Sequence, residues 1–75
     1  MQFIRIRKLR EDFDYTQEQM AEYLNIKQGT YSDYERGNIN IPIEAFIKLS
    51  AIFNVSLDYL AGITDVKKTY PRKTL

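Results

Sequence analysis

The sequence predicts an all-helical domain of five short helices, and three observations lead to this fold class. Apolar residues recur at helical spacing in successive segments, and residues that cap or stop helices lie between those segments. The chain has 75 residues, 44% of them hydrophobic, with six tyrosines and four phenylalanines, which suffices for one small core. We therefore expect one compact unit without a second domain.

The first helix is expected to run from about residue 3 to residue 12 or 13. One of its faces carries, at i, i+3, i+4 and i+7 spacing, three apolar residues and one arginine: Ile6, Leu9, Arg10 and Phe13. Asp14 follows at a position where a left-handed residue is expected and aspartate is tolerated.

The second helix is expected to begin after Thr16, because Thr16 and Gln19 have the spacing of a capping box. Its inward face consists of Met20, Ala21 and Leu24, and the small Ala21 allows a neighbouring helix to cross closely. Asn25 is a suitable left-handed residue to end it. A tight turn then leads to the next helix.

The third helix is expected over residues 28–36, bounded by Gly37, with Tyr31 and Tyr34 as an inner i, i+3 pair. Its remaining positions are short and polar, whereas a merely solvated face favours lysine and glutamate. The outer face is therefore rich in hydrogen-bonding groups of low bulk: Gln28, Gly29, Thr30, Ser32 and Asp33.

Two further helices complete the predicted fold. Pro42 is expected at the first position of the fourth helix, whose apolar residues continue at helical spacing to Phe53 before Asn54 ends it. Ser56 is expected to cap the fifth helix and Gly62 to terminate it. Residues 1–62 are thus predicted to form the domain and residues 63–75 a basic, loosely ordered tail.

Composition excludes several classes of function. The chain contains no cysteine and no histidine, so disulfides, Cys/His zinc sites, thiolate nucleophiles and the residue most used as a general base near neutral pH are absent, and we expect neither a metal nor a cofactor. No apolar run approaches the roughly 18 residues of a membrane span. We predict a cytoplasmic protein without membrane contact and without enzymatic activity.

Charge is distributed unevenly although the net value is only +1. Residues 1–10 and residues 66–75 carry four positive charges each, so the basic residues lie at the two ends. A basic face suited to nucleic acid requires that these ends approach each other. Net charge by itself favours nucleic-acid binding only weakly.

The second and third helices have the spacing of a helix-turn-helix: small Ala21, left-handed Asn25 and inward Tyr31. This arrangement crosses the two helices steeply and projects the second of them from the surface, so that it can enter the major groove of duplex DNA. Such helix pairs are common, so the spacing indicates this function with moderate specificity.

Several motifs in order resemble the lambdoid phage repressor and Cro type of helix-turn-helix, also called the XRE family. The motifs cover about residues 4 to 64, and they are Thr16-Gln17-Glu18-Gln19-Met20-Ala21, Tyr34-Glu35-Arg36-Gly37, Ile41-Pro42 and Val55-Ser56-Leu57-Asp58-Tyr59-Leu60-Ala61-Gly62. The resemblance implies a five-helix repressor-like domain that binds duplex operator DNA and regulates transcription.

The resemblance also implies roles for individual residues. Base contacts fall on Gln28, Gly29, Thr30, Ser32 and Asp33, with Gln28 suited to adenine and Asp33 to the amino group of cytosine. Phosphate contacts are implied for Gln17 and for residues flanking the third helix and near the N-terminus: Lys27, Arg36, Asn38, Asn40, Arg5 and Lys8. Arg10 and Glu35 match a partly buried ion pair that fixes the first helix against the third.

The favoured interpretation is a repressor, autoregulatory and of the phage or restriction-controller kind, that acts as a homodimer. The apolar residues Ile43, Ile47, Ile52 and Tyr59 either complete the core or form the dimer surface. The alternative is an antitoxin-like or adaptor module that uses the same fold to bind a protein partner. Binding to a protein partner that does not require DNA and that persists at high salt favours this alternative.

Overall fold

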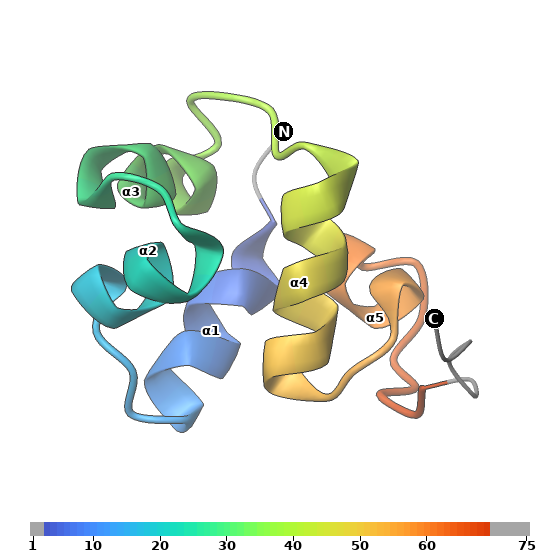
Figure 1. Ribbon diagram of the computed structural model, residues 1–75. Helices are drawn as coiled ribbons and strands as arrows, with labels where there is room; N and C mark the ends of the chain where they lie inside the picture. The colour runs from blue at the N-terminus through green and yellow to red at the C-terminus, as the bar shows by residue number, and fades with distance from the viewer. Residues whose placement is uncertain (1–2, 70–75) are drawn as a thin grey trace.

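Five α-helices account for the secondary structure of residues 3–69, the part of the chain that the computed structural model describes (Figure 1). No strand occurs in that part. The helices are α1 (Ile4–Asp12), α2 (Gln17–Leu24), α3 (Gln28–Arg36), α4 (Ile43–Phe53) and α5 (Leu57–Ala61). The predicted fold class and the number of helices are confirmed.

The helix ends follow the residues that the sequence provides for them. Thr16 and Gln19 form the capping box of α2, and the Ser56 hydroxyl accepts from the Tyr59 amide at 3.0 Å at the start of α5. Five residues with positive φ end helices or follow their ends: Asp14, Asn25, Gly37, Asn54 and Gly62. Local chemistry therefore fixes the lengths of these helices.

The start of α4 differs by one residue from the prediction. Pro42 has a ψ of 148°, which is extended, so it is the residue before the helix and Ile43 is the first helical residue. The ring fixes only φ, at −59°, and φ near that value serves an extended residue as well as a helical one. The proline thus marks the entry to α4 without belonging to it.

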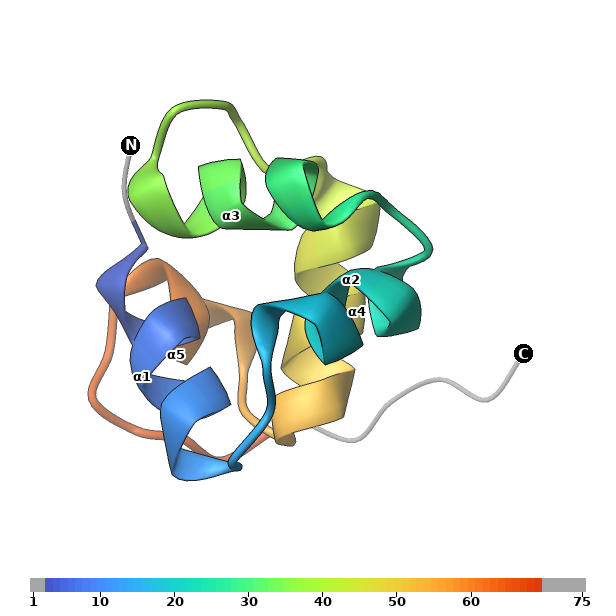
Figure 2. The same cartoon turned by 90° about the vertical axis from the view of Figure 1, so that its left-hand side faces the viewer.

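A single core lies between the helices. It contains the inward faces of α1, α2 and α4 together with both tyrosines of α3, and its buried hydrophobic members are Ile6, Leu9, Met20, Ala21, Leu24, Tyr31, Tyr34, Phe46, Leu49, Phe53, Val55 and Leu60. In two perpendicular views α3 and the loop after it lie at one edge of the molecule (Figures 1 and 2). The core therefore supports α3 from one side only.

The chain after α5 runs back along the domain. The Ser56 amide donates to the Lys67 carbonyl at 3.0 Å, and Arg5 of α1 hydrogen-bonds the carbonyl of Thr64. These contacts attach residues 64–67 to α1 and α5. They belong to the segment predicted as a loosely ordered tail, of which residues 70–75 lie outside the described part of the chain.

Candidate nucleic-acid interface

The turn between α2 and α3 sets the relative orientation of these helices. Asn25 is left-handed at φ 56°, and the Ile26 amide returns to the Ala21 carbonyl at 2.9 Å. Ala21 is buried, so its small side chain lets α3 approach, and the Tyr31 ring is fully buried behind α3. A three-residue turn thus joins two tightly packed helices, which is the geometry of a helix-turn-helix.

The outer face of α3 is polar and low in bulk. Gln28 and Gly29 are exposed, whereas three neighbouring residues are half-buried: Thr30, Ser32 and Asp33. A Cβ atom at Gly29 would meet no atom within 4 Å, so packing does not require glycine there. Glycine in a helix interior costs about 1 kcal/mol relative to alanine, and this is an upper bound for Gly29, which lies in the first turn of α3. The exposed start of α3 therefore leaves room for a surface to approach the helix closely.

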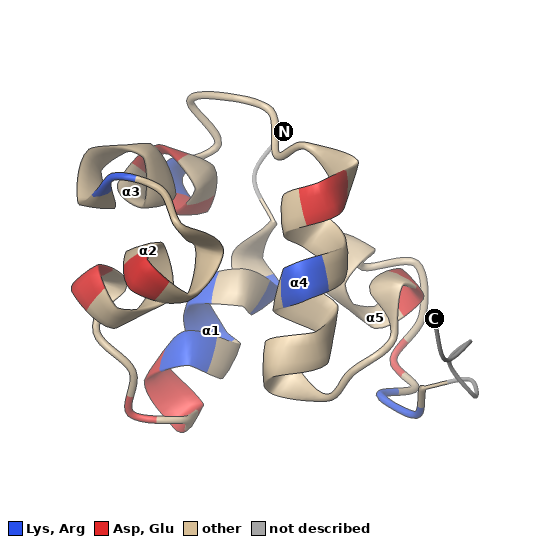
Figure 3. Cartoon of the chain, viewed as in Figure 1, with Lys and Arg blue, Asp and Glu red and all other residues tan. Residues whose placement is uncertain are grey.

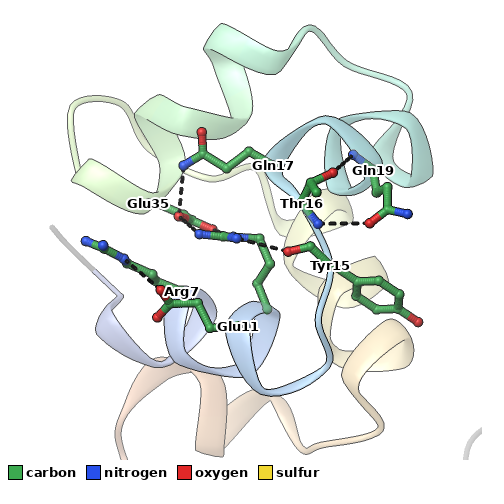
Figure 4. Close-up of polar contacts among 8 residues, drawn as sticks. Arg7, Glu11, Tyr15, Thr16, Gln17, Gln19 and Glu35 are labelled. Carbon is green, nitrogen blue, oxygen red and sulfur yellow. Dashed lines mark hydrogen bonds and ion pairs between the residues drawn. The ribbon is translucent and has the colours of Figure 1, made fainter.

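An ion pair buried beneath α3 connects it to α1. Arg10 Nε lies 2.7 Å from Glu35 Oε2, and its Nη1 donates to the Tyr15 carbonyl at 3.0 Å. The Gln17 side chain, from α2, donates to Glu35 Oε1 at 3.1 Å. Figure 4 shows Gln17 and Glu35 pointing toward each other from their separate helices. Three helices thus meet at one carboxylate.

This cluster changes the protonation of its members. Burial favours the neutral form of Glu35, but the hydrogen bonds from Arg10 and Gln17, together with the nearby Tyr31 hydroxyl, outweigh burial and lower the pKa of the carboxyl. The hydrogen bond to Glu35 raises the pKa of Arg10. Burial, with help from Glu35, raises the pKa of the Tyr31 hydroxyl. At neutral pH the pair is charged and Tyr31 is neutral, so the cluster is fixed in one state.

Gln17 has a role here that the sequence did not indicate. Its amide was expected to contact a phosphate, but in the structure this amide is a donor to Glu35 at 3.1 Å. One N–H and the carbonyl oxygen of the amide are left for other partners. The signal that could have revealed the contact is the helical pattern itself, since Gln17 is the first residue of α2 and Glu35 lies in the last turn of α3, and these two helices pack together.

Arg5 is engaged within the protein. Its guanidinium donates to the carbonyls of Tyr59 and Thr64, lies 2.6 Å from Asp65 and stands over the Tyr59 ring at 4.1 Å. Lys8 lines a shallow groove of about 430 Å³ beside Arg5 and Tyr59. Both residues therefore lie on the α1–α5 side of the domain, and the proposed DNA interface does not include them.

The other expected phosphate ligands surround α3. Lys27 precedes the helix without making a side-chain cap, and Arg36 is exposed in its last turn. Asn38 and Asn40 are exposed in the following loop, where Asn38 donates to Asp33 at 3.2 Å. Figure 3 shows acidic residues on α2 and at the end of α1, so the α2–α3 surface carries charges of both signs. Any electrostatic attraction to DNA is therefore local.

The described residues hold no cluster of histidine, cysteine, aspartate and glutamate that could bind a metal ion. Their longest helix has 11 residues, and no helix there has both the length and the apolar character that a membrane crossing needs.

Known proteins resemble this chain in sequence and in fold. The family model described as Helix-turn-helix matches residues 6–60. The chain is 41% identical over 64 residues to the HTH-type transcriptional regulator ImmR of Bacillus subtilis, a match that covers 85% of this chain and 50% of ImmR. The chain spans about half the length of the curated relatives it matches.

Solved structures agree with the fold. The N-terminal DNA-binding domain of SinR from Bacillus subtilis superposes with a TM-score of 0.67 at 30% identity, covering 75% of this chain and 83% of that domain. A complex of SinR protein with SinI protein superposes with a TM-score of 0.71, also at 30% identity, covering 80% of this chain and 59% of that one.

Proposed function

This chain belongs to the XRE-type helix-turn-helix family, and from that premise we propose that it binds operator DNA through α3 and represses transcription. The proposal places Gln28 and its neighbours on α3 against base edges in the major groove, in the cytoplasm. The relatives that the chain resembles are named transcriptional regulators and not enzymes, which accords with the absence of cysteine and histidine.

The observation that carries the proposal is the outer face of α3. This helix lies at an edge of the molecule, its tyrosines anchor it in the core, and its outward residues are short hydrogen-bonding side chains. A major groove about 12 Å wide admits a helix with side chains of this size. Glutamine at the exposed start of such a helix suits adenine, to which it donates and from which it accepts.

Phosphate contacts would come from the two ends of α3. Lys27 lies before the helix and Arg36 in its last turn, and both are exposed. Each phosphate that a lysine or arginine neutralises steepens the dependence of log K on log salt by about 0.9. With so few basic residues beside α3, we expect a shallow salt dependence and a binding energy in which base contacts have a large share.

We propose a homodimer whose contact includes α4. Ile43 and Ile47 lie one turn apart on this helix with 64% and 44% of their surface exposed, and Ile39 is exposed in the preceding loop. Of the four apolar residues considered from the sequence, Ile52 and Tyr59 pack against the core. Ile43 and Ile47 are therefore the members available to a second copy. A symmetric dimer places two α3 helices on half-sites about 34 Å apart.

The DNA-binding proposal is tested by fluorescence anisotropy with duplexes tiled across the region upstream of the gene, at several salt concentrations. We expect the chain to select one tile and Gln28→Ala to relax that selection. Lys27→Ala should lower the salt slope by about 1. Lys48→Ala removes the same charge from an exposed position on α4 and serves as the matched control, with the slope unchanged. Equal, weak binding of every tile by all variants contradicts the proposal.

The dimer proposal is tested by analytical ultracentrifugation of the chain and of Ile47→Lys. We expect the variant to remain monomeric at concentrations where the parent chain dimerises, because a charge at the contact must lose its hydration. Retention of the dimer in Ile47→Lys, with unchanged circular dichroism, would place the contact elsewhere.

A protein partner is a second candidate function. It is favoured by the likeness to a SinR structure that was solved as a complex with the SinI protein. Affinity capture at high salt separates the candidates, since DNA binding weakens with salt and an apolar protein contact persists. A salt-resistant partner together with no selective DNA binding would favour the adaptor or antitoxin-like role.

A further inference from the structure

The C-terminal end of α3 has a geometry that brings two polar residues together. Gly37 is left-handed at φ 75°, the Gly37 amide donates to the Tyr34 carbonyl at 3.3 Å, and the Asn38 amide donates to the Asp33 carbonyl at 3.0 Å. This pair of hydrogen bonds is a Schellman motif. Its consequence is that the backbone of Asn38 is fixed next to Asp33, although five positions separate them.

The side chains of these two residues are also bonded. Asn38 Nδ2 donates to Asp33 Oδ1 at 3.2 Å. An ionised carboxylate only accepts hydrogen bonds, so the contact also orients the Asn38 amide with its NH₂ group toward Asp33. Two bonds, one from the backbone and one from the side chain, thus join the same pair of residues and restrict the Asp33 carboxylate to one direction.

The partner of Asp33 is neutral, and this preserves the carboxylate as an acceptor. Among residues 3–69, none of the ion pairs involves Asp33, and Oδ1 is its side-chain oxygen that accepts a hydrogen bond. The second oxygen keeps its capacity to accept from a ligand. A lysine or arginine in place of Asn38 would instead neutralise the charge.

The surface beside Asp33 is open. Gly29 lies one helical turn before Asp33 on the same side of α3, and a Cβ atom there would meet nothing within 4 Å. A base edge can therefore approach this part of the helix without meeting a side chain from the preceding turn. In the major groove, cytosine N4 and adenine N6 both present amino donors that a carboxylate accepts, but adenine also presents the N7 acceptor beside its donor. Guanine and thymine present acceptors that repel a carboxylate, so cytosine suits Asp33 best.

From this geometry we propose that Asn38 is a positioning residue that holds the Asp33 carboxylate as the acceptor for the N4 amino group of a cytosine. The inference rests on the proposed DNA-binding function and names one base that α3 selects. It also gives Asn38 a role different from the phosphate contact expected from the sequence. The expected signature is altered sequence preference with little change in the electrostatic part of binding.

The experiment starts from a pool of duplexes with randomised positions, from which the full chain selects its preferred site. Affinities are then measured for that site and for its single base-pair variants. We expect a cytosine position whose preference disappears in Asp33→Ala and falls roughly fivefold in Asn38→Ala. In the Asp33→Ala background, Asn38→Ala should have no further effect on that preference, which a merely structural role of Asn38 would not produce.

Asn40→Ala is the matched control, since Asn40 is an exposed asparagine in the same loop and its loss should leave the cytosine preference intact. Thermal unfolding of each variant checks its fold. Equal weakening of all duplexes by Asn38→Ala, with the salt slope unchanged because asparagine carries no charge, would make Asn38 a phosphate ligand and overturn the inference. Selective binding with no cytosine dependence on Asp33 would overturn it as well. A chain that enriches no site from the pool overturns the proposed function itself.

Discussion

Two arginines of α1 bind acidic residues from distant parts of the chain, and their surroundings differ sharply. Arg10 pairs at 2.7 Å with Glu35, whose side chain is 3% exposed. Arg5 pairs at 2.6 Å with Asp65, whose side chain is 96% exposed. The short distances are nearly equal, so the two pairs differ in burial and in a second hydrogen bond of the buried pair, from Arg10 Nη2 to Glu35 Oε1 at 3.3 Å.

The comparison indicates what each pair contributes. Water screens an exposed ion pair and competes for its hydrogen bonds, so its net contribution is small. The effect of a buried pair on stability appears mainly when one member is removed, because the remaining charge is then buried without a partner. The pair beneath α3 therefore fixes the position of this helix, whereas the pair near α5 adds little to the backbone contacts that Arg5 also makes.

The largest expected effect comes from breaking the buried pair. Glu35→Gln leaves the Arg10 guanidinium, 13% exposed, without its charge partner, and should lower the free energy of unfolding by about 3 kcal/mol at pH 7. Urea unfolding followed by circular dichroism measures the change. Replacement of both members by apolar residues, Arg10→Met with Glu35→Leu, should restore part of the loss. A double variant less stable than Glu35→Gln would contradict this account of the pair.

A smaller effect is expected when acid removes the charge of Glu35. The pKa of Glu35 is lower in the folded chain than its ordinary value of 4.5, so the unfolded chain binds the proton more readily. The stabilisation by this group is fully present above pH 4.5 and is lost as pH falls through the lower, folded pKa. Urea midpoints measured from pH 7 to pH 3 should therefore fall less steeply for Glu35→Gln than for the parent chain. Equal slopes would show that another carboxylate dominates.

The smallest effect is expected at the exposed pair. Asp65→Asn should shift the midpoint of thermal unfolding by less than about 2 °C, because water screens the interaction that is lost. Arg5→Ala provides the comparison from the other member, and it should shift the midpoint further since it also removes two hydrogen bonds to carbonyls and the contact with the Tyr59 ring. Equal shifts in the two variants would mean that the ion pair itself dominates.

Much of the fold was predictable because its signals are local. Thr16 with Gln19, Ser56, Asn25, Gly37 and Gly62 each act within one helical turn, and the helices begin and end where these residues lie. Tyr31 and Tyr34 were predicted as core residues on helical spacing, and both are buried. The one-residue error at Pro42 arose because proline fixes φ and leaves ψ undetermined.

The candidate site was predictable only in outline. Sequence indicated α3 as the helix facing DNA and listed its outward side chains, but the partners of Gln17 and Arg5 depend on where other helices and the returning chain lie. The partner of Asn38 depends on the local turn that ends α3. Each of these residues was expected to contact phosphate, and each donates to an acceptor within the protein. A polar side chain that faces solvent in an isolated helix finds a protein partner once the helices pack.

The sequence by itself determined five helices, their ends and the face that each buries, because periodicity and capping act between residues close in the chain. Tertiary structure decided which donors and acceptors meet. Glu35 gathers Arg10 of α1 and Gln17 of α2 only because α3 crosses both helices, and Arg5 reaches Thr64 only because the chain returns after α5. These contacts join residues 18 to 59 positions apart, so packing and not local pattern selects them.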